Sequence, residues 1–180
     1  MCGRGGTSLN FGEAVGRRLV SLPRMEDNGH SPLWEGEAMT RLTEILKRRS
    51  PVLNTLSPDQ TVAEAVRVMA DRHVGAVLVV EAGRLVGIFS ERDLLRRVVV
   101  NDTSPAHTQL RTVMTRDPIT AGPGDERMIA VIKMREGDCR HLPIVTEGVV
   151  VDMVSIRDLL FDELEERKTE IEDLMRYIHN

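Results

Sequence analysis

Two short stretches decide the fold of this chain: "GIFSERDLL" at residues 87–95 and "DMVSIRDLL" at residues 152–160. Each stretch places Ser-x-Arg-Asp-Leu-Leu after an apolar run. The shared polar residues form the pairs Ser90/Ser155, Arg92/Arg157 and Asp93/Asp158. Asp93 and Asp158 are related by a constant shift in residue number, the repeat offset. The same shift also aligns the flanking sequence without a gap. The chain therefore contains an internal duplication.

The duplication extends over residues 52–96 and 117–161, where 13 positions are identical between the copies. The identities fall at expected turns, helix starts and core positions, and they include Thr55/Thr120, Pro58/Pro123, Ala65/Ala130, Met69/Met134, Gly83/Gly148 and Val86/Val151. Each copy reads as a short extended piece, an amphipathic helix, two strands joined by a glycine turn, and a final helix. We therefore predict two β-α-β-β-α units.

The first copy predicts its elements in most detail. Residues 39–49 are expected to form a helix that stops at Ser50-Pro51, because the residue before a proline avoids the α region. Ser57 or Asp59 is expected to cap the next helix, at residues 61–73. Residues 75–90 are expected to form a strand, a turn and a second strand, and residues 91–100 a helix.

One such unit leaves a face of its three-stranded sheet poorly covered, so it needs a partner to bury that face. Two units in tandem supply the partner, with their sheets packed face to face around a pseudo-two-fold axis. The predicted class is mixed α/β (α+β). The predicted boundaries are 39–103 for the first repeat and 108–165 for the second.

Composition excludes several classes of function. A net charge of −4 gives no general attraction to nucleic-acid backbones, and five aromatic residues are too few for base-stacking platforms. No run approaches the ~20 apolar residues of a membrane span. His73, His107 and His141 lack metal-ligand spacing. Cys139 is expected to be a core thiol, with no structural disulfide.

The two ends of the chain differ from the repeats. Residues 1–38 hold seven of the fourteen glycines and are expected to be mostly disordered. In a eukaryote their arginines would suggest an organellar transit peptide, and otherwise a cytoplasmic protein is expected. Residues 166–180 extend the last helix, either packed on their own domain or paired with another chain through a coiled-coil seam. That seam comprises Leu160, Leu164, Ile171, Leu174 and Ile178.

The repeated Ser-x-Arg-Asp has two interpretations. Ser90 and Asp93 can simply cap a helix. Alternatively, free N–H groups at a helix start attract phosphate, and the carboxylate can accept hydrogen bonds from ribose hydroxyls. The neighbouring arginine would add charge for phosphate. A bare cap needs no arginine, so the motif favours a nucleotide.

The duplicated motif, Gly-apolar-apolar-Ser-x-x-Asp after a strand pair, resembles the cystathionine-β-synthase (CBS) domain, two of which form a Bateman module. The resemblance covers roughly residues 40–165. It implies a regulatory module that binds adenosine-containing ligands, namely AMP, ADP, ATP, NAD or S-adenosylmethionine, in clefts between the two domains. It also implies a homodimer, built on helices such as 61–72 and 126–136, that regulates an unknown protein.

The resemblance assigns ligand contacts residue by residue. The motif contributes Ser90, Arg92, Asp93, Ser155, Arg157 and Asp158. The short first strand would meet the adenine edge at Asn54, Thr55, Ile119 and Thr120. The start of the second strand would face the cleft at residues 73–76, including Gly75, and at residues 140–143, including Arg140 and His141.

One departure distinguishes the two motifs, since Gly87 opens the first and Asp152 the second. A glycine allows close approach, whereas an aspartate adds bulk and negative charge. We therefore expect the Asp93 cleft to bind a nucleotide more tightly than the Asp158 cleft.

Two functions from different classes remain open. The first is the nucleotide-sensing regulatory module. The alternative is a structural adaptor that dimerises and scaffolds with empty clefts. No nucleophile, base and orienting group stand together, so the chain is not expected to be an enzyme.

Overall fold

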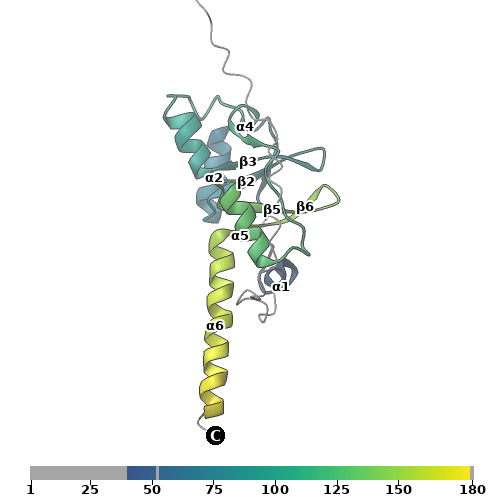
Figure 1. Ribbon diagram of the computed structural model, residues 1–180. Helices are drawn as coiled ribbons and strands as arrows, with labels where there is room; N and C mark the ends of the chain where they lie inside the picture. Colours follow the sequence, from purple (N-terminus) through teal and green to yellow (C-terminus); the bar gives the residue numbers. More distant parts are fainter. Residues whose placement is uncertain (1–39, 52, 179–180) are drawn as a thin grey trace, which may run out of the picture. The chain divides into compact units, whose positions relative to one another are not determined.

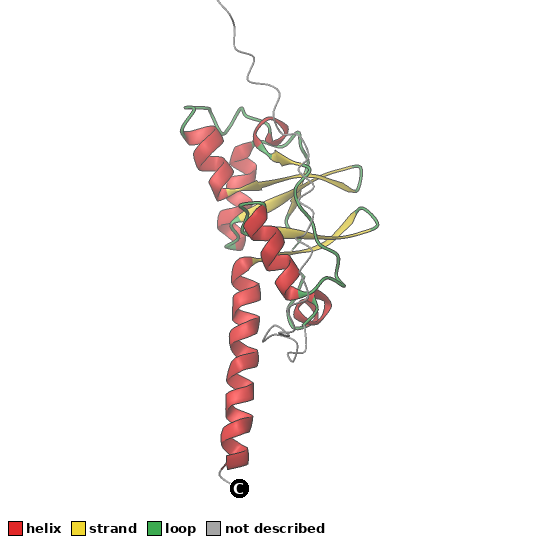
Figure 2. Cartoon of the chain, viewed as in Figure 1, coloured by secondary structure: helices red, strands yellow, loops and turns green. Residues whose placement is uncertain are grey.

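The computed structural model describes residues 40–51 and 53–178, so the expectation of disorder over residues 1–38 lies outside the described residues. The described chain contains these elements in order (Figures 1 and 2): α1 (Leu42–Lys47), β1 (Thr55–Leu56), α2 (Val62–Arg72), β2 (Ala76–Glu81), β3 (Arg84–Ser90), α3 (Glu91–Asp93), η1 (Leu94–Val99), α4 (Leu110–Val113), β4 (Thr115–Arg116), α5 (Arg127–Glu136), β5 (His141–Thr146), β6 (Val149–Ser155) and α6 (Ile156–Ile178). The mixed fold is confirmed, and both repeats follow the predicted β-α-β-β-α order, except that the first strand of the second repeat is reduced to an isolated bridge at Ala121.

The first repeat forms a four-stranded sheet in the order β1-β2-β3-β4. Strand β1 runs parallel to β2, whereas the β2–β3 and β3–β4 pairs are antiparallel. The β2–β3 turn places Ala82 at φ 48° and Gly83 at φ 78°. Positive φ at both central residues is the backbone of a tight hairpin turn, and it explains the glycine repeated at position 148.

The second repeat reproduces this hairpin in detail. Strands β5 and β6 pair antiparallel, with a register shift between Ile144 and Val145 that matches the one between Val79 and Val80. An isolated parallel bridge joins Ala121 to Ile144, and the repeat offset carries the β1–β2 pair Leu56–Val79 onto this bridge. The offset read from the sequence is therefore also an offset in backbone pairing.

Helix starts follow local chemistry, with one difference from expectation. Thr61, not Ser57 or Asp59, caps α2 in a capping box with Glu64. An acidic residue three positions after the cap returns a hydrogen bond to the cap's own N–H, and this reciprocity favours Thr61. The expected helix at residues 91–100 begins as α3 and widens into the π-helical η1.

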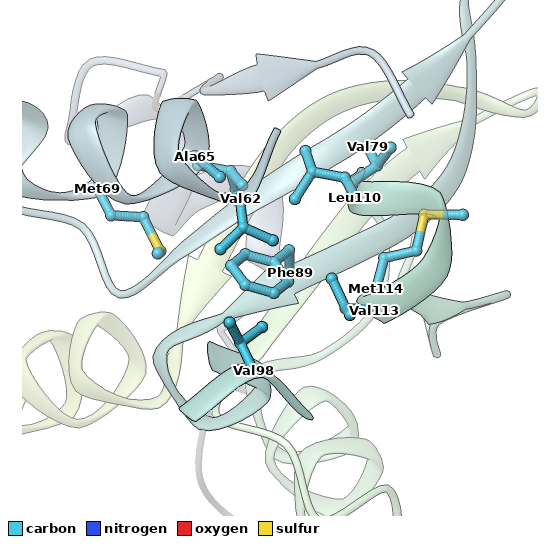
Figure 3. Close-up of a cluster of buried hydrophobic side chains, with 10 residues drawn as sticks. Val62, Ala65, Met69, Val79, Phe89, Val98, Leu110, Val113 and Met114 are labelled. Atoms are coloured by element: carbon cyan, nitrogen blue, oxygen red, sulfur yellow. The ribbon is translucent and has the colours of Figure 1, made fainter. Parts of the chain in front are cut away.

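The segment that precedes each repeat, called its leading segment, packs into the core of the other repeat. Leu42 and Ile45 of α1 are buried in the cluster of the second repeat, with Ala130, Leu142, Val154 and Leu159. Leu110, Val113 and Met114 are buried in the cluster of the first repeat, as Figure 3 shows around Phe89. Backbone bonds fix both crossings, Leu42 N–H to Asp125 O at 2.9 Å and Leu110 N–H to Gln60 O at 2.9 Å. Each repeat is thus completed by the leading segment of the other, a crossing that the boundaries 39–103 and 108–165 do not convey.

A third buried cluster joins the repeats. Ala76, Leu78 and Ile88 of the first sheet pack with Met153 of the second. The two hairpins consequently lie side by side (Figure 1). Strands β3 and β6 end at this junction, where each passes into the helix that begins with the repeated motif.

Helix α6 is anchored at its beginning and exposed at its end. The buried Asp162 accepts hydrogen bonds from Arg48 at 2.7 Å and from Arg127 at 3.1 Å. Burial raises the pKa of Glu166, but hydrogen bonds from Thr40 and Arg127 outweigh it and hold that pKa below its ordinary value. The later part of the helix extends away from the strands (Figure 2). Among the described residues, no helix is both long and apolar enough to cross a membrane.

Candidate functional site

Two clefts lie between the repeats, and each takes its name from the motif aspartate in its wall. The Asp158 cleft has a volume of about 680 Å³. The first repeat and its leading segment line it with Arg49, Ser50, Met69, Ala70, His73, Val74, Gly75 and Glu91, and the second repeat with Arg140, His141, Met153, Ser155, Ile156, Arg157 and Asp158. This cleft therefore has walls from both repeats.

The Asp93 cleft is much smaller, at about 110 Å³. Its lining contains Ile88, Ser90, Arg92, Asp93, Thr115, Gly137, Asp138 and Cys139, together with four residues that it shares with the Asp158 cleft: Gly75, Glu91, Arg140 and His141. The two clefts thus meet at shared residues, and one is wide while the other is nearly closed.

Both motif aspartates form the expected helix cap. Asp93 Oδ2 accepts hydrogen bonds from Ser90 N–H at 2.9 Å and Ser90 Oγ at 2.7 Å. Asp158 Oδ2 accepts the corresponding bonds from Ser155 at 2.7 and 2.8 Å. Capping therefore uses one carboxylate oxygen in each repeat.

The second carboxylate oxygen distinguishes the two clefts. Asp93 Oδ1 accepts a hydrogen bond from Thr115 Oγ1 at 3.1 Å and lies 3.4 Å from Arg97 Nη2. Within residues 40–51 and 53–178, Asp158 Oδ1 has no hydrogen-bond donor or cation of its own. The repeat offset carries Arg97 onto Asp162, which offers a carboxylate instead of a guanidinium. Asp158 consequently keeps an acceptor available at the wall of the wide cleft.

An arginine closes the Asp93 cleft. Arg92 Nη1 lies 2.9 Å from Asp138 Oδ2 and also donates to the Asp138 carbonyl. The equivalent residues in the Asp158 cleft are Arg157 and His73. Asp138 and His73 both follow a helix in left-handed backbone, at φ 45° and 54°. A histidine at that place does not hold the arginine as an aspartate does, and Arg157 has no ion pair within the described chain.

The expected role of Gly87 and Asp152 was wrong. A Cβ on Gly87 would lie 2.5 Å from Met114 Sδ, so the leading segment fills the space beside that glycine. Asp152 is buried and lies 3.2 Å from Arg49 Nη2, and Arg49 is the counterpart of Met114 at the repeat offset. In the first repeat the small Gly87 leaves room for the Met114 side chain. At the equivalent place in the second repeat, Asp152 forms an ion pair with Arg49. Neither residue of the pair Gly87 and Asp152 lines a cleft, so the reason for a tighter Asp93 cleft fails.

Most predicted contact residues line a cleft. Ser90, Arg92 and Asp93 line one, Ser155, Arg157 and Asp158 line the other, and Gly75, Arg140 and His141 line both. Asn54, Thr55, Ile119 and Thr120 line neither. Thr55 lies in the exposed strand β1, paired with Leu78, and the Thr120 carbonyl accepts a hydrogen bond from Lys133.

The sequence prediction missed Ser50 and Thr115, which stand where the short strand was expected to meet the ligand. They are also related by the repeat offset, and each lies shortly before a proline. This pair of hydroxyl residues was the available signal. Ser50 and Thr115 were missed because each leading segment crosses to the other repeat. That crossing places Ser50 and Thr115 in the clefts, whereas β1 and its counterpart line neither cleft.

Two side chains at the junction have shifted pKa values. Burial lowers the pKa of His141, and the Arg140 guanidinium lowers it further, so the imidazole is neutral near pH 7. Burial raises the pKa of the Cys139 thiol, which is half-buried at the edge of the second core cluster and also lines the Asp93 cleft. The described residues contain no group of three histidine, cysteine or acidic side chains that could hold a metal ion.

A family model described as CBS domain matches residues 42–100 and again residues 110–164. The chain belongs to the CBS-domain family. CBS domain-containing protein CBSX3, mitochondrial, of Arabidopsis thaliana is 30% identical over 164 residues, covering 86% of this chain and 76% of that protein. CBS domain-containing protein CBSCBSPB2 of the same plant is 34% identical over 134 residues, but these are only 24% of its length.

Solved CBS structures share the fold. A protein with CBS domains from Burkholderia ambifaria superposes with a TM-score of 0.67 at 29% identity, covering 70% of this chain and 95% of that one. A CBS domain protein from Pyrobaculum aerophilum, solved as a complex with AMP, has a TM-score of 0.60 at 29% identity. That alignment covers 66% of this chain and 89% of the archaeal one.

Proposed function

We propose that this chain is a regulatory module that binds an adenosine-containing nucleotide in its Asp158 cleft. The observation that carries the proposal is the available Oδ1 of Asp158 at the wall of a cleft of about 680 Å³. A carboxylate oxygen of this kind accepts hydrogen bonds from the vicinal hydroxyls of a ribose.

The surroundings of Asp158 suit the rest of a nucleotide. Helix α6 begins at Ile156. The Ile156 and Asp158 N–H groups already donate to Arg140 O and Ser155 Oγ, so the Arg157 N–H and the positive end of the helix are what can attract a phosphate. Met69, Val74 and Met153 offer apolar surface for a base within the same cleft. The AMP complex of the archaeal CBS protein supports this class of ligand.

The proposal reverses the expected preference between clefts. In the Asp93 cleft both carboxylate oxygens are occupied, Arg92 is held by Asp138, and the volume is about 110 Å³. A nucleotide there would have to displace these contacts. We therefore expect one nucleotide per chain, in the Asp158 cleft.

A thermal-shift panel of AMP, ADP, ATP, NAD and S-adenosylmethionine tests the proposal. A ligand at about 100 times its dissociation constant stabilises the folded state by about 2.7 kcal/mol. Asp158→Asn keeps a capping side chain but loses the charge that holds the ribose. A hydrogen bond to a charged group contributes about 1.5–3 kcal/mol, so affinity should fall about 10- to 150-fold.

Asp93→Asn is the matched control, because it makes the same change in the other cap and should leave affinity within about twofold. If no adenosine ligand shifts the unfolding temperature, the adaptor function replaces this proposal. If Asp93→Asn abolishes binding while Asp158→Asn does not, the wrong cleft has been assigned.

We also propose that the chain forms a homodimer. Helix α5 leaves Met128, Ile129 and Ile132 exposed, and α6 leaves Leu164, Ile171 and Leu174 exposed. Apolar stripes at helical spacing are typical of helix–helix contacts. Light scattering at tens of micromolar should give twice the chain mass, and a monomer at that concentration would contradict the proposal.

A further inference from the structure

Two arginines, Arg92 and the shared Arg140, line the Asp93 cleft, and three line the Asp158 cleft. The three are Arg49, Arg140 and Arg157. The residues at the corresponding positions of the other repeat are Met114, Gly75 and Arg92. Arg140 lines both clefts, so the Asp158 cleft adds Arg49 and Arg157 to it, whereas the Asp93 cleft adds only Arg92, which Asp138 holds.

Two of the three arginines make no ion pair within the described residues. Arg140 and Arg157 are exposed and have no carboxylate partner within the part of the chain that the structure describes. Arg49 donates from Nη2 to the Met153 carbonyl at 2.8 Å and lies near Asp152, while its buried Nε has no partner among the described residues. Arg49 is thus held by protein contacts, and Arg140 and Arg157 are the arginines left to bind a ligand.

The acids in the cleft are fewer than the cations. Asp158 and Glu91 are the carboxylates in its wall, against three arginines. Asp158 is already bonded to Ser155, and the proposed function uses its remaining oxygen for the ribose. Arg49 already pairs with Asp152, so Glu91 alone is left to oppose the guanidinium groups of Arg140 and Arg157.

We infer that the Asp158 cleft selects an adenine nucleotide with more than one phosphate, and that Arg140 and Arg157 are its phosphate contacts. This inference rests on the proposed function and deepens it. The single phosphate of AMP can be held at the start of α6 with Arg157. Arg140 precedes β5, and its carbonyl accepts the Ile156 N–H at 2.9 Å, so it lies beside the start of α6 and is then left for a second or third phosphate. Guanidinium groups bind phosphate oxygens in pairs, which gives both charge and geometry to the selection.

Isothermal titration calorimetry with AMP and ATP, in EDTA so that no metal masks the phosphates, tests the inference. Wild-type protein should bind ATP at least about tenfold more tightly than AMP. Arg140→Gln should weaken ATP binding about tenfold and AMP binding less than about threefold, because AMP lacks the outer phosphates. Arg157→Gln should weaken both nucleotides. An increase in salt should weaken ATP binding more than AMP binding.

Arg92→Gln is the matched control, since it removes the equivalent arginine from the closed cleft and should leave both affinities within about twofold. Unchanged unfolding temperatures would confirm that each variant folds. Equal affinity for AMP and ATP, or equal losses of both in Arg140→Gln, would overturn the inference and leave the proposed function intact. Failure of both nucleotides to bind wild-type protein would overturn the two together.

Discussion

Because each leading segment packs into the core of the other repeat, a mutation before the first repeat should destabilise the second repeat. Leu42 is fully buried among residues of the second repeat, and Leu110 is fully buried in the first. Leu42→Ala and Leu110→Ala are therefore a matched pair, with the same atoms removed from equivalent places in the two cores.

The magnitude follows from the burial of these leucines. A leucine truncated to alanine in a packed core costs about 2–5 kcal/mol, as lost transfer free energy plus the cavity left behind. Every ~1.4 kcal/mol is a factor of ten in an equilibrium constant, so local opening should rise by about 30-fold or more. The opening should concentrate in the repeat whose core is damaged.

Native-state hydrogen exchange measured by mass spectrometry reads this out by segment. Leu42→Ala should accelerate exchange in peptides covering β5 and β6, which lie far from Leu42 along the chain. Leu110→Ala should accelerate exchange in β2 and β3. Faster exchange in β2 and β3 for Leu42→Ala, with β5 and β6 unchanged, would refute the exchanged cores.

Three further predictions concern packing, charge and pH. Gly87→Ala should cost about 1–3 kcal/mol of unfolding free energy in urea, since the new Cβ has no room; Gly124→Ala, with nothing within 4 Å, should change it by less than about 0.5 kcal/mol, and equal effects would contradict this packing. Asp162→Asn should lower the free energy of unfolding by about 1–3 kcal/mol, because Arg48 and Arg127 lose their buried anion. Glu170→Gln on the exposed part of α6 should change it by less than about 0.5 kcal/mol. A loss of less than about 0.5 kcal/mol for Asp162→Asn would contradict the role of Asp162 in holding α6. The pKa of His141 is lower in the folded chain than its unfolded value of about 6.5, so the unfolded state binds more protons below that pH and stability should fall as pH decreases from 7 to 5. His141→Gln should reduce that fall when unfolding free energy is measured by urea denaturation at each pH, and an undiminished fall would contradict the shift.

The fold was predictable because duplication constrains it strongly. The repeat offset aligned caps, turns and strands in two copies, so each local pattern was read twice. The repeated Gly83 and Gly148 marked both hairpins, and the repeated Ser-x-x-Asp marked both helix caps. Local signals of this kind survive in the folded chain because they depend on neighbouring residues only.

The exchanged segments and the difference between the clefts were not predictable, since both depend on contacts between distant residues. Nothing near Leu42 in the sequence indicates that its neighbours are Leu142 and Val154. The significance of Asp138 appears only when Arg92 is seen to reach it across 46 residues. In the sequence, the difference between Asp138 and His73 at equivalent positions of the two repeats was the nearest sign that the clefts differ.

The most direct test of the account is a crystal structure of the chain with bound ATP. We predict one nucleotide per chain in the Asp158 cleft, with its ribose hydroxyls on Asp158, its phosphates between Arg140 and Arg157, and the Arg92–Asp138 pair intact. A nucleotide whose ribose lies on Asp93, with the Asp158 cleft empty, would contradict the account.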